Sequence, residues 1–209
     1  MAAATEDDNG SGVRQTGRAI DVNLTRLGRG LSYTISHANF TPDFRAATGF
    51  IRRVDQQNTG VRGSYTFWPQ NKVVVSWGQF GTYSLNYNHE GQIEDHTLGT
   101  STFVRFVRNI TVNTQNWGGT ERFGGVTFRK YHHAVTGDLN FSRRFSANLY
   151  WRWEDEIRYI ATPFLGRSTT GSAEFAFRPA SSFETGLPAN LSRFVDPRTN
   201  TEVFDVRLY

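Results

Sequence analysis

The chain has 209 residues, a formal net charge of +4 and no cysteine, which excludes disulfides and cysteine-ligated metals. Its basic residues are scattered rather than gathered in one block, so a nucleic-acid partner is not expected. Mean hydropathy is -0.51, and no apolar run approaches the ~20 residues of a transmembrane helix, but aromatic residues make up 14%, a composition that favours strands.

The first part of the chain predicts a loop followed by a hairpin. Residues 1–16 are polar and small, so we expect a loop or disordered segment, followed by a β-domain over 17–209. Alternating apolar residues predict paired strands over 20–25 and 31–36, joined by a tight turn. The start has no basic and apolar signal regions and the end falls within a predicted strand. We therefore expect a domain truncated at both ends, with an export signal upstream.

The segment from Lys72 to Asn88 carries the strongest structural signal. One parity is apolar and aromatic and includes Val75, Trp77 and Tyr83, whereas the other parity is mostly small and polar. Side chains of a strand alternate between its two faces, so this pattern predicts one long strand with an apolar face and a polar face. Strands of soluble domains usually have ~5–6 residues. A longer strand with aromatic residues near its ends is typical of a membrane-spanning barrel.

The rest of the chain continues this pattern. We predict strands over 93–105 and 109–117, a loop over 118–129, a hairpin over 135–153, a loop near 162–170 and further strands to the end. About a dozen strands without a convincing helix predict an all-β, antiparallel up-and-down transmembrane β-barrel. A soluble β-sandwich that binds carbohydrate through exposed aromatics is the alternative. A third hypothesis is a β-structured, glycan-active enzyme that uses Glu154 and Glu156.

One motif resembles a known bacterial family. Thr41-Pro42-Asp43-Phe44, followed by Gly49-Phe50-Ile51-Arg52-Arg53-Val54-Asp55, is similar to a stretch of large envelope proteins. These pair an N-terminal module like family 9 carbohydrate-binding modules with a C-terminal outer-membrane β-barrel domain of unknown function. The resemblance implies a barrel in the bacterial outer membrane that acts as an envelope channel or as the anchor of a periplasmic sugar-binding module, without catalysis. It supplies no catalytic residues.

Two groups of charged residues are candidate sites. Polar residues inside a barrel pair across strands, because a charge facing lipid costs ~2–4 kcal/mol at the midplane. We therefore predict a lumen charge network, with solute selection by its arginines as the functional alternative; its members are Arg52, Arg53, Asp55 and Arg105. Glu154, Asp155 and Glu156 form the densest acidic cluster, which we interpret as a solvated rim or a rim cation site.

Aromatic residues near the predicted strand ends suggest two interfacial girdles at the membrane surfaces. The members are Trp68, Trp77, Tyr83, Tyr87, Trp117, Trp151 and Trp153. Among the histidines, His132 and His133 point to opposite faces of one strand, and His89 and His96 could meet across a hairpin. No resident metal or cofactor is expected. The expected partners are outer-membrane lipid and lipopolysaccharide, with oligo- or polysaccharide reached through an upstream module.

Overall fold

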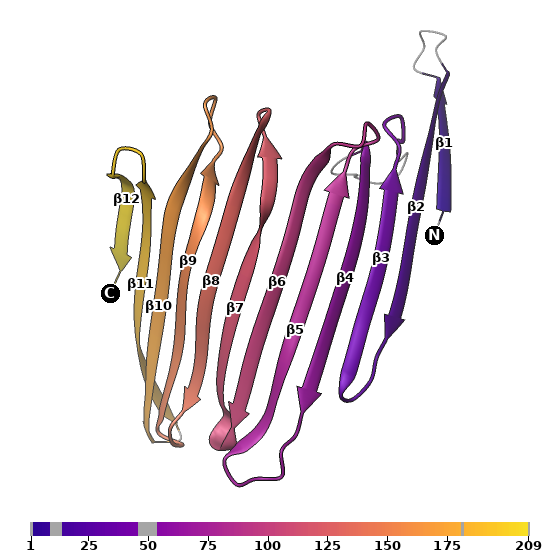
Figure 1. Ribbon diagram of the computed structural model, residues 1–209. Helices are drawn as coiled ribbons and strands as arrows, with labels where there is room; N and C mark the ends of the chain where they lie inside the picture. The colour runs from indigo at the N-terminus through magenta and orange to yellow at the C-terminus, as the bar shows by residue number, and fades with distance from the viewer. Residues whose placement is uncertain (1, 9–13, 46–53, 181, 209) are drawn as a thin grey trace.

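The computed structural model describes residues 2–8, 14–45, 54–180 and 182–208. Twelve antiparallel strands form one sheet whose spatial order follows the chain from β1 to β12 (Figure 1). The described part of the chain contains no helix with the length and apolar character needed to cross a bilayer. The strands are β1 Ala2–Asp8, β2 Arg14–Arg26, β3 Leu31–Phe40, β4 Gln56–Phe67, β5 Val74–Tyr87, β6 Ile93–Phe106, β7 Ile110–Phe123, β8 Val126–Asn140, β9 Phe145–Arg158, β10 Phe164–Ala180, β11 Phe183–Asp196 and β12 Thr201–Leu208.

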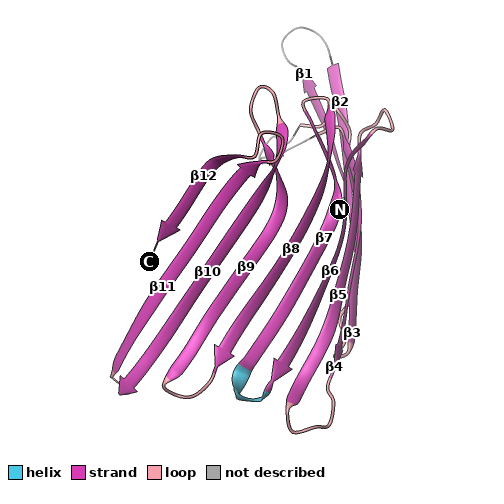
Figure 2. Cartoon of the chain, turned by 60° about the vertical axis from the view of Figure 1, so that its left-hand side comes forward, coloured by secondary structure: helices cyan, strands magenta, loops and turns pink. Residues whose placement is uncertain are grey.

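The all-β, up-and-down prediction is confirmed, and the strands are long. The long strand expected over 72–88 is β5, which has 14 residues, and β10 reaches 17 residues. Every neighbouring pair is joined by a hairpin connection, so no strand crosses over another. The sheet bends, so that in Figure 2 strands β8 to β12 are seen from the face while β3 to β5 are seen nearly edge-on.

The described strands do not close into the ring that a barrel requires. Strand β1 pairs only with β2, and β12 pairs only with β11, so these two strands are the edges of an open sheet. The second sheet required by the sandwich alternative is also absent from the described residues, because all twelve strands belong to a single sheet.

Three predicted loops are instead extended. Strand β1 occupies most of the first eight residues, where we expected a loop over 1–16. Strands β7 and β8 continue through the loop expected over 118–129 and leave only Gly124 and Gly125 between them. These two glycines have φ values of 58° and 80°, which only glycine adopts readily. Strand β10 likewise covers most of the loop expected near 162–170.

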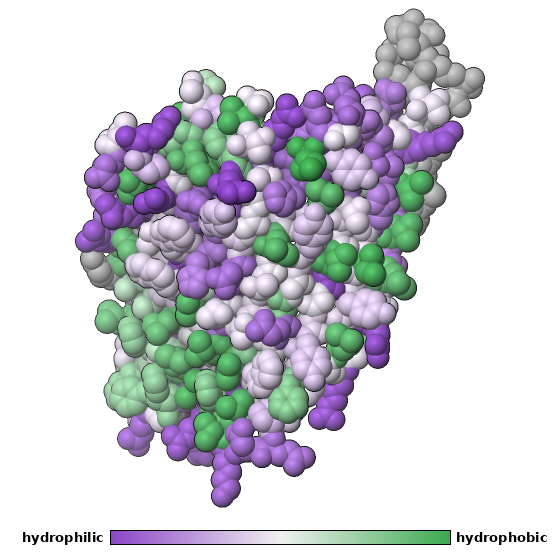
Figure 3. All heavy atoms as spheres, viewed as in Figure 1, coloured by the Kyte–Doolittle hydropathy of each residue, from purple (hydrophilic) through white to green (hydrophobic). Residues whose placement is uncertain are grey.

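The two faces of the sheet differ in chemistry along most of its width. The apolar face is the one to which Trp77 points, and the strand register places Val61, Leu98, Leu149 and Trp151 on the same face. In Figure 3, hydrophobic residues gather over the lower half of β8 to β11, above a hydrophilic fringe.

The polar face is the better covered of the two. On it, Ser76 is 2% exposed and Ser168 is 3% exposed, whereas Trp151 on the apolar face is 50% exposed. Side chains on the inside of a bent sheet crowd one another, so this difference fits a polar face on the inner side of the bend. The described residues have no hydrophobic core of the usual kind; the buried apolar residues are Ala19, Phe44, Ala134, Ala147, Ile157 and Phe194.

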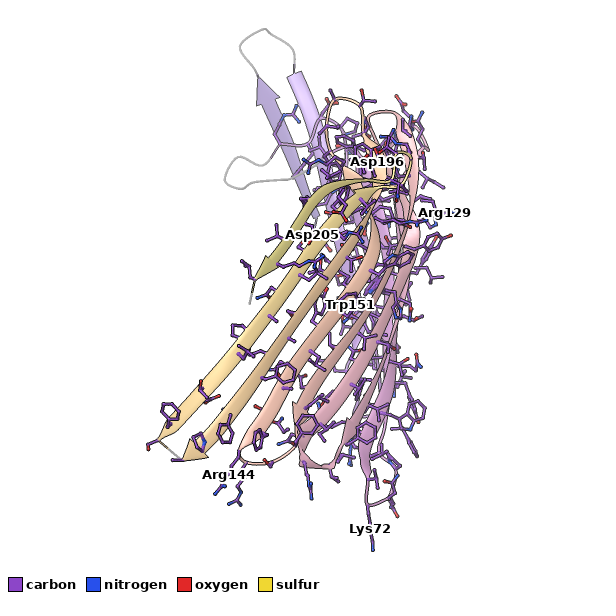
Figure 4. The ribbon with its side chains drawn as sticks, turned by 90° about the vertical axis from the view of Figure 1, so that its left-hand side faces the viewer. Lys72, Arg129, Arg144, Trp151, Asp196 and Asp205 are labelled. Carbon is purple, nitrogen blue, oxygen red and sulfur yellow. The ribbon has the colours of Figure 1, made fainter. Side chains whose placement is uncertain are left out.

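The connections fall at two edges, which we call the upper and lower rims. Among the described residues, the upper rim is formed by 41–45, 54–55, 88–92, 124–125, 159–163 and 197–200, and the lower rim by 27–30, 68–73, 107–109, 141–144 and 182. In Figure 4, Asp196 and Arg129 lie toward the upper rim, Trp151 lies between the rims, and Lys72 and Arg144 extend from the lower rim.

Strand β12 departs from the pattern of the two faces. The register places Phe204 and Val206 with the polar parity of β11, and Asp205 and Arg207 with its apolar parity. The two charged side chains form an ion pair in which Arg207 Nη2 lies 2.9 Å from Asp205 Oδ2. The edge strand therefore does not extend the uniform apolar surface of its neighbours.

Candidate functional site

A groove of about 980 Å³ lies on the polar face near the upper rim. Strands β4 to β9 and the connection after β9 contribute its walls, because their polar side chains meet there. The charged and aromatic side chains that line it include Asp95, Glu121, Lys130, His132, Glu154 and Trp117.

One end of the groove is closed by a network around Glu121. Lys130 Nζ lies 2.9 Å from Glu121 Oε2, and the Tyr159 hydroxyl donates a hydrogen bond of 2.6 Å to Glu121 Oε1. Tyr159 stands in the connection after β9, so this carboxylate links β7 and β8 to the upper rim. Burial, followed by the hydrogen bond from its hydroxyl to Glu121 and the negative charge of Glu121, raises the pKa of Tyr159 to about 12.

A second network surrounds Glu154 on β9. His132 Nδ1 on β8 lies 3.0 Å from Glu154 Oε2, and Arg152 Nε lies 3.2 Å from Glu154 Oε1. Arg152 also donates a hydrogen bond of 3.3 Å to the hydroxyl of Thr170 on β10. Arg152 thus pairs with Glu154 within β9, while the contacts with His132 and with Thr170 cross to the neighbouring strands and tie β8, β9 and β10 together.

Trp117 lies on the polar face, which differs from its predicted place in an aromatic girdle. The register sets it opposite Gly99 on β6 and His132 on β8. Its ring packs over Gly99, where a Cβ atom would come within 2.3 Å of the ring, and its centroid is 6.5 Å from that of Phe80. Because β7 continues to Phe123, Trp117 lies in the middle of a strand rather than at its end.

The other aromatic residues of the predicted girdles that lie in strands are on the face that strand alternation predicts. Trp77, Tyr83 and Tyr87 lie on the apolar face of β5 and Trp151 and Trp153 on that of β9. Trp68 stands in the lower rim, where the Arg29 guanidinium lies 5.1 Å from its ring centroid. Whether these residues meet a membrane interface stays a prediction.

The predicted lumen network of arginines and Asp55 is not assembled as one cluster. Arg52 and Arg53 lie outside the described residues. Asp55 stands in the upper rim, 2.9 Å from His89 Nδ1, whereas Arg105 is close to the lower end of β6. The length of β6 therefore separates Asp55 from Arg105.

The acidic cluster at the end of β9 is divided between the two faces. Glu154 and Glu156 share the polar parity, whereas Asp155 has the opposite parity and accepts a hydrogen bond from the backbone N–H of Tyr131. Within the described ranges, no group of three or more histidine, aspartate or glutamate residues is arranged to hold a metal ion. The predicted rim cation site is therefore not preassembled.

The histidines have separate partners and do not form a common site. His89 contacts Asp55 and Asn39 in the upper rim, and His96 contacts Thr120, so the pair does not meet across the hairpin. His132 and His133 point to opposite faces as predicted, toward Glu154 and Asn116.

Sequence reasoning missed two features of the site. Glu121 was assigned to the loop expected over 118–129, and neither Lys130 nor Tyr159 was proposed as a site residue. Alternation beyond Gly118-Gly119 is the signal that would have extended β7 to include Glu121. It also missed a basic hollow in the lower rim around Arg143, described below. Comparison with protein-family models, with curated proteins and with solved structures found no match.

Proposed function

We propose that this chain is part of the wall of an outer-membrane β-barrel, with its apolar face toward lipid and its polar face toward water. The proposed role is an envelope channel or the membrane anchor of a periplasmic carbohydrate-binding module, as the motif that begins at Thr41 implies. The chain would then work by its two surfaces rather than by catalysis.

The observation that supports this proposal is a broad apolar face that nothing in the described residues covers. Exposed fractions reach 60% for Leu98, 50% for Trp151 and 65% for Leu187, and all three share that face. Contiguous exposed apolar surface of this extent marks a membrane or protein contact in a folded chain. Lipid fits because strands of this length, with polar residues on the other face, suit the apolar band of a barrel, about 25 Å tall.

The polar face supports a water-facing role. Its charged side chains are paired across strands around Glu121 and Glu154, and hydroxyl and amide groups fill the positions between them. Among the described residues, carboxylates outnumber lysine and arginine on this face, so its charge is weighted toward acid. The acids that share it include Asp21, Asp95, Glu121, Asp138, Glu154, Glu156 and Glu174.

Membrane association of the full chain tests the proposal. The chain is diluted from denaturant in the presence of phosphatidylcholine liposomes, which are then floated and washed with alkaline carbonate and with urea. We expect the chain to float with the liposomes, to resist both washes and to show β-structure by circular dichroism. A chain that folds as a stable monomer without lipid and does not float would contradict the proposal.

The carbohydrate-binding alternative has a separate readout. If the exposed aromatics bind sugar, the folded chain should be retarded on an insoluble glucan matrix, and Trp151→Ala together with Trp153→Ala should abolish that retardation. Under our proposal the chain in detergent shows no such retardation.

A further inference from the structure

The lower rim is basic, whereas the upper rim has mixed charge. Residues 27–30, 68–73, 107–109 and 141–144 contain Arg29, Lys72, Arg108, Arg143 and Arg144, and none of the five lower connections contains an acidic residue. The upper connections contain acids and bases together, for example Asp43 with Arg45. In Figure 4, Lys72 and Arg144 both extend away from the sheet at this edge.

Three of these basic residues line a hollow of about 540 Å³ in the lower rim, together with one arginine of β10. Four arginines line it: Arg108 from the connection after β6, Arg143 and Arg144 from the connection after β8, and Arg178 from the end of β10. Polar groups of Asn109, Ser142 and Ser146 also line the hollow, and none of the described residues that line it is acidic.

Three of these arginines have no carboxylate partner in the part of the chain that the structure describes. Arg178 is paired, because its Nε lies 2.8 Å from Glu184 Oε2, but Arg108, Arg143 and Arg144 form no ion pair there. Several guanidinium groups around one hollow create a positive potential that an anion with several oxygen atoms can satisfy by charge-assisted, bidentate hydrogen bonds.

The backbone holds this hollow in a defined shape. The Ser142 hydroxyl accepts hydrogen bonds of 3.1 Å from the backbone N–H groups of Arg144 and of Phe145. The side chain of Asn140 donates a hydrogen bond of 3.1 Å to the carbonyl of Asn109, which joins the two neighbouring connections. Arg178 donates its backbone N–H to the carbonyl of Arg144 at 2.8 Å.

The hollow borders the apolar face. Phe145, which helps to line it, stacks on Phe177 with ring centroids 4.7 Å apart, and both side chains belong to the apolar parity. An anion that binds here would therefore have its charged group among arginines and an apolar surface directly next to it. That combination matches a phospholipid, whose phosphate lies at the boundary of its acyl chains.

We propose that the lower rim binds the phosphate of an anionic phospholipid headgroup in the hollow formed by Arg108, Arg143, Arg144 and Arg178. The proposal rests on the proposed function, because a lipid reaches this rim only if the adjoining face lies in a bilayer. It adds an orientation, since the lower rim would contact a leaflet rich in anionic phospholipid.

The test is a calorimetric titration of the full chain folded in dodecylmaltoside, a detergent without phosphate. The chain is titrated with dihexanoylphosphatidylglycerol, with dihexanoylphosphatidylcholine and with inorganic phosphate. The test variant is Arg143→Gln with Arg144→Gln, two exposed residues of one connection. The matched control is Arg129→Gln with Arg158→Gln, which removes the same charge from exposed positions toward the other rim.

We expect the wild type to bind phosphatidylglycerol more tightly than the other two probes. Each arginine near an anionic lipid contributes about 1 kcal/mol, so the Arg143/Arg144 variant should bind phosphatidylglycerol about 30-fold more weakly. The control should change the affinity by less than about threefold, because its arginines line no part of the hollow.

Three results would overturn the inference: equal affinity of the test variant and the wild type, equal losses in both double variants, or inorganic phosphate binding as tightly as phosphatidylglycerol. The last result would identify a site for a free anion. A chain that floats with liposomes but shows no preference for phosphatidylglycerol would refute this inference alone. A chain that does not associate with lipid at all would refute the proposed function.

Discussion

At the scale of single residues, Tyr159 joins the upper rim to the polar face through a short hydrogen bond to Glu121. Its pKa is raised to about 12 from an ordinary value of 10.0, so the protonated hydroxyl is favoured in the folded state. The stabilisation is fully present below pH 10, and it is lost as the pH rises through the folded value near 12.

Replacing Tyr159 by phenylalanine should therefore eliminate one tyrosine that ionises at unusually high pH. The absorbance of tyrosinate is followed against pH for the wild type and for Tyr159→Phe, both folded in detergent. The difference between the two titration curves should have its midpoint near 12. A midpoint near the ordinary value would show that the contact with Glu121 does not form.

The close contact between Gly99 and Trp117 gives a second prediction. A Cβ atom at Gly99 would come within 2.3 Å of the indole ring, whereas one at Gly81, on the neighbouring strand, would meet nothing within 4 Å. We expect Gly99→Ala to lower the free energy of unfolding by about 1–3 kcal/mol, as overpacking does. Gly81→Ala should be neutral or slightly stabilising, because alanine restricts the unfolded chain.

Urea denaturation in detergent, followed by tryptophan fluorescence, measures both alanine variants. Equal midpoints for Gly99→Ala and Gly81→Ala would contradict the position of Trp117 on the polar face.

At the scale of strands, the alternation of apolar and polar residues predicted the two faces of a strand reliably. The period of two in β5 and β9 predicted which residues share a face, because that period follows from strand geometry and needs no long-range information. Strand ends were predicted less well. Gly118-Gly119 suggested a loop, yet Gly119 lies in a strand where a Cβ atom would come within 2.0 Å of the His96 carbonyl oxygen. These glycines permit close packing rather than a turn.

The contacts that build the groove could not be predicted from local sequence. Glu121 meets Tyr159 only because the registers of two successive strand pairs, β7–β8 and β8–β9, place them at the same height, and each register depends on pairing over the full strand length. The basic hollow was missed for a similar reason, because its arginines come from two connections and from the end of β10, which are distant in sequence.

Adjacent positions on β9 test the two faces directly. Trp151 lies on the apolar face and Tyr150 on the polar face, so each is an aromatic residue near the middle of the same strand. If the apolar face meets lipid, Trp151→Arg should destabilise the chain in liposomes by about 2–4 kcal/mol, because it places a charge in hydrocarbon. Tyr150→Arg should be tolerated, since its side chain faces water and the hydroxyl groups of Thr136 and Ser172.

Folding titrations with urea in the presence of liposomes compare these two arginine variants with the wild type. A larger loss of stability for Tyr150→Arg than for Trp151→Arg would reverse the assignment of the faces.

At the scale of the whole molecule, one bent sheet has a lipid-like surface on one side and a paired, polar surface on the other. The described strands leave β1 and β12 as open edges with unpaired backbone groups, which cannot be left in hydrocarbon without a large cost. If the apolar face lies in lipid, the backbone groups of these edges must be paired within the membrane. From β2 to β11 most of the large exposed apolar residues share one face, as the wall of a barrel requires.

The most direct test compares the environments of two tryptophans in the reconstituted chain. Two variants retain only Trp151 or only Trp117, with phenylalanine at the other four tryptophan positions. Each is reconstituted in liposomes and quenched with brominated phosphatidylcholine and, separately, with iodide in the aqueous phase. We predict that brominated lipid quenches Trp151 strongly and Trp117 little. Quenching of Trp117 by brominated lipid as strong as that of Trp151, or quenching of Trp151 by iodide alone, would contradict the account.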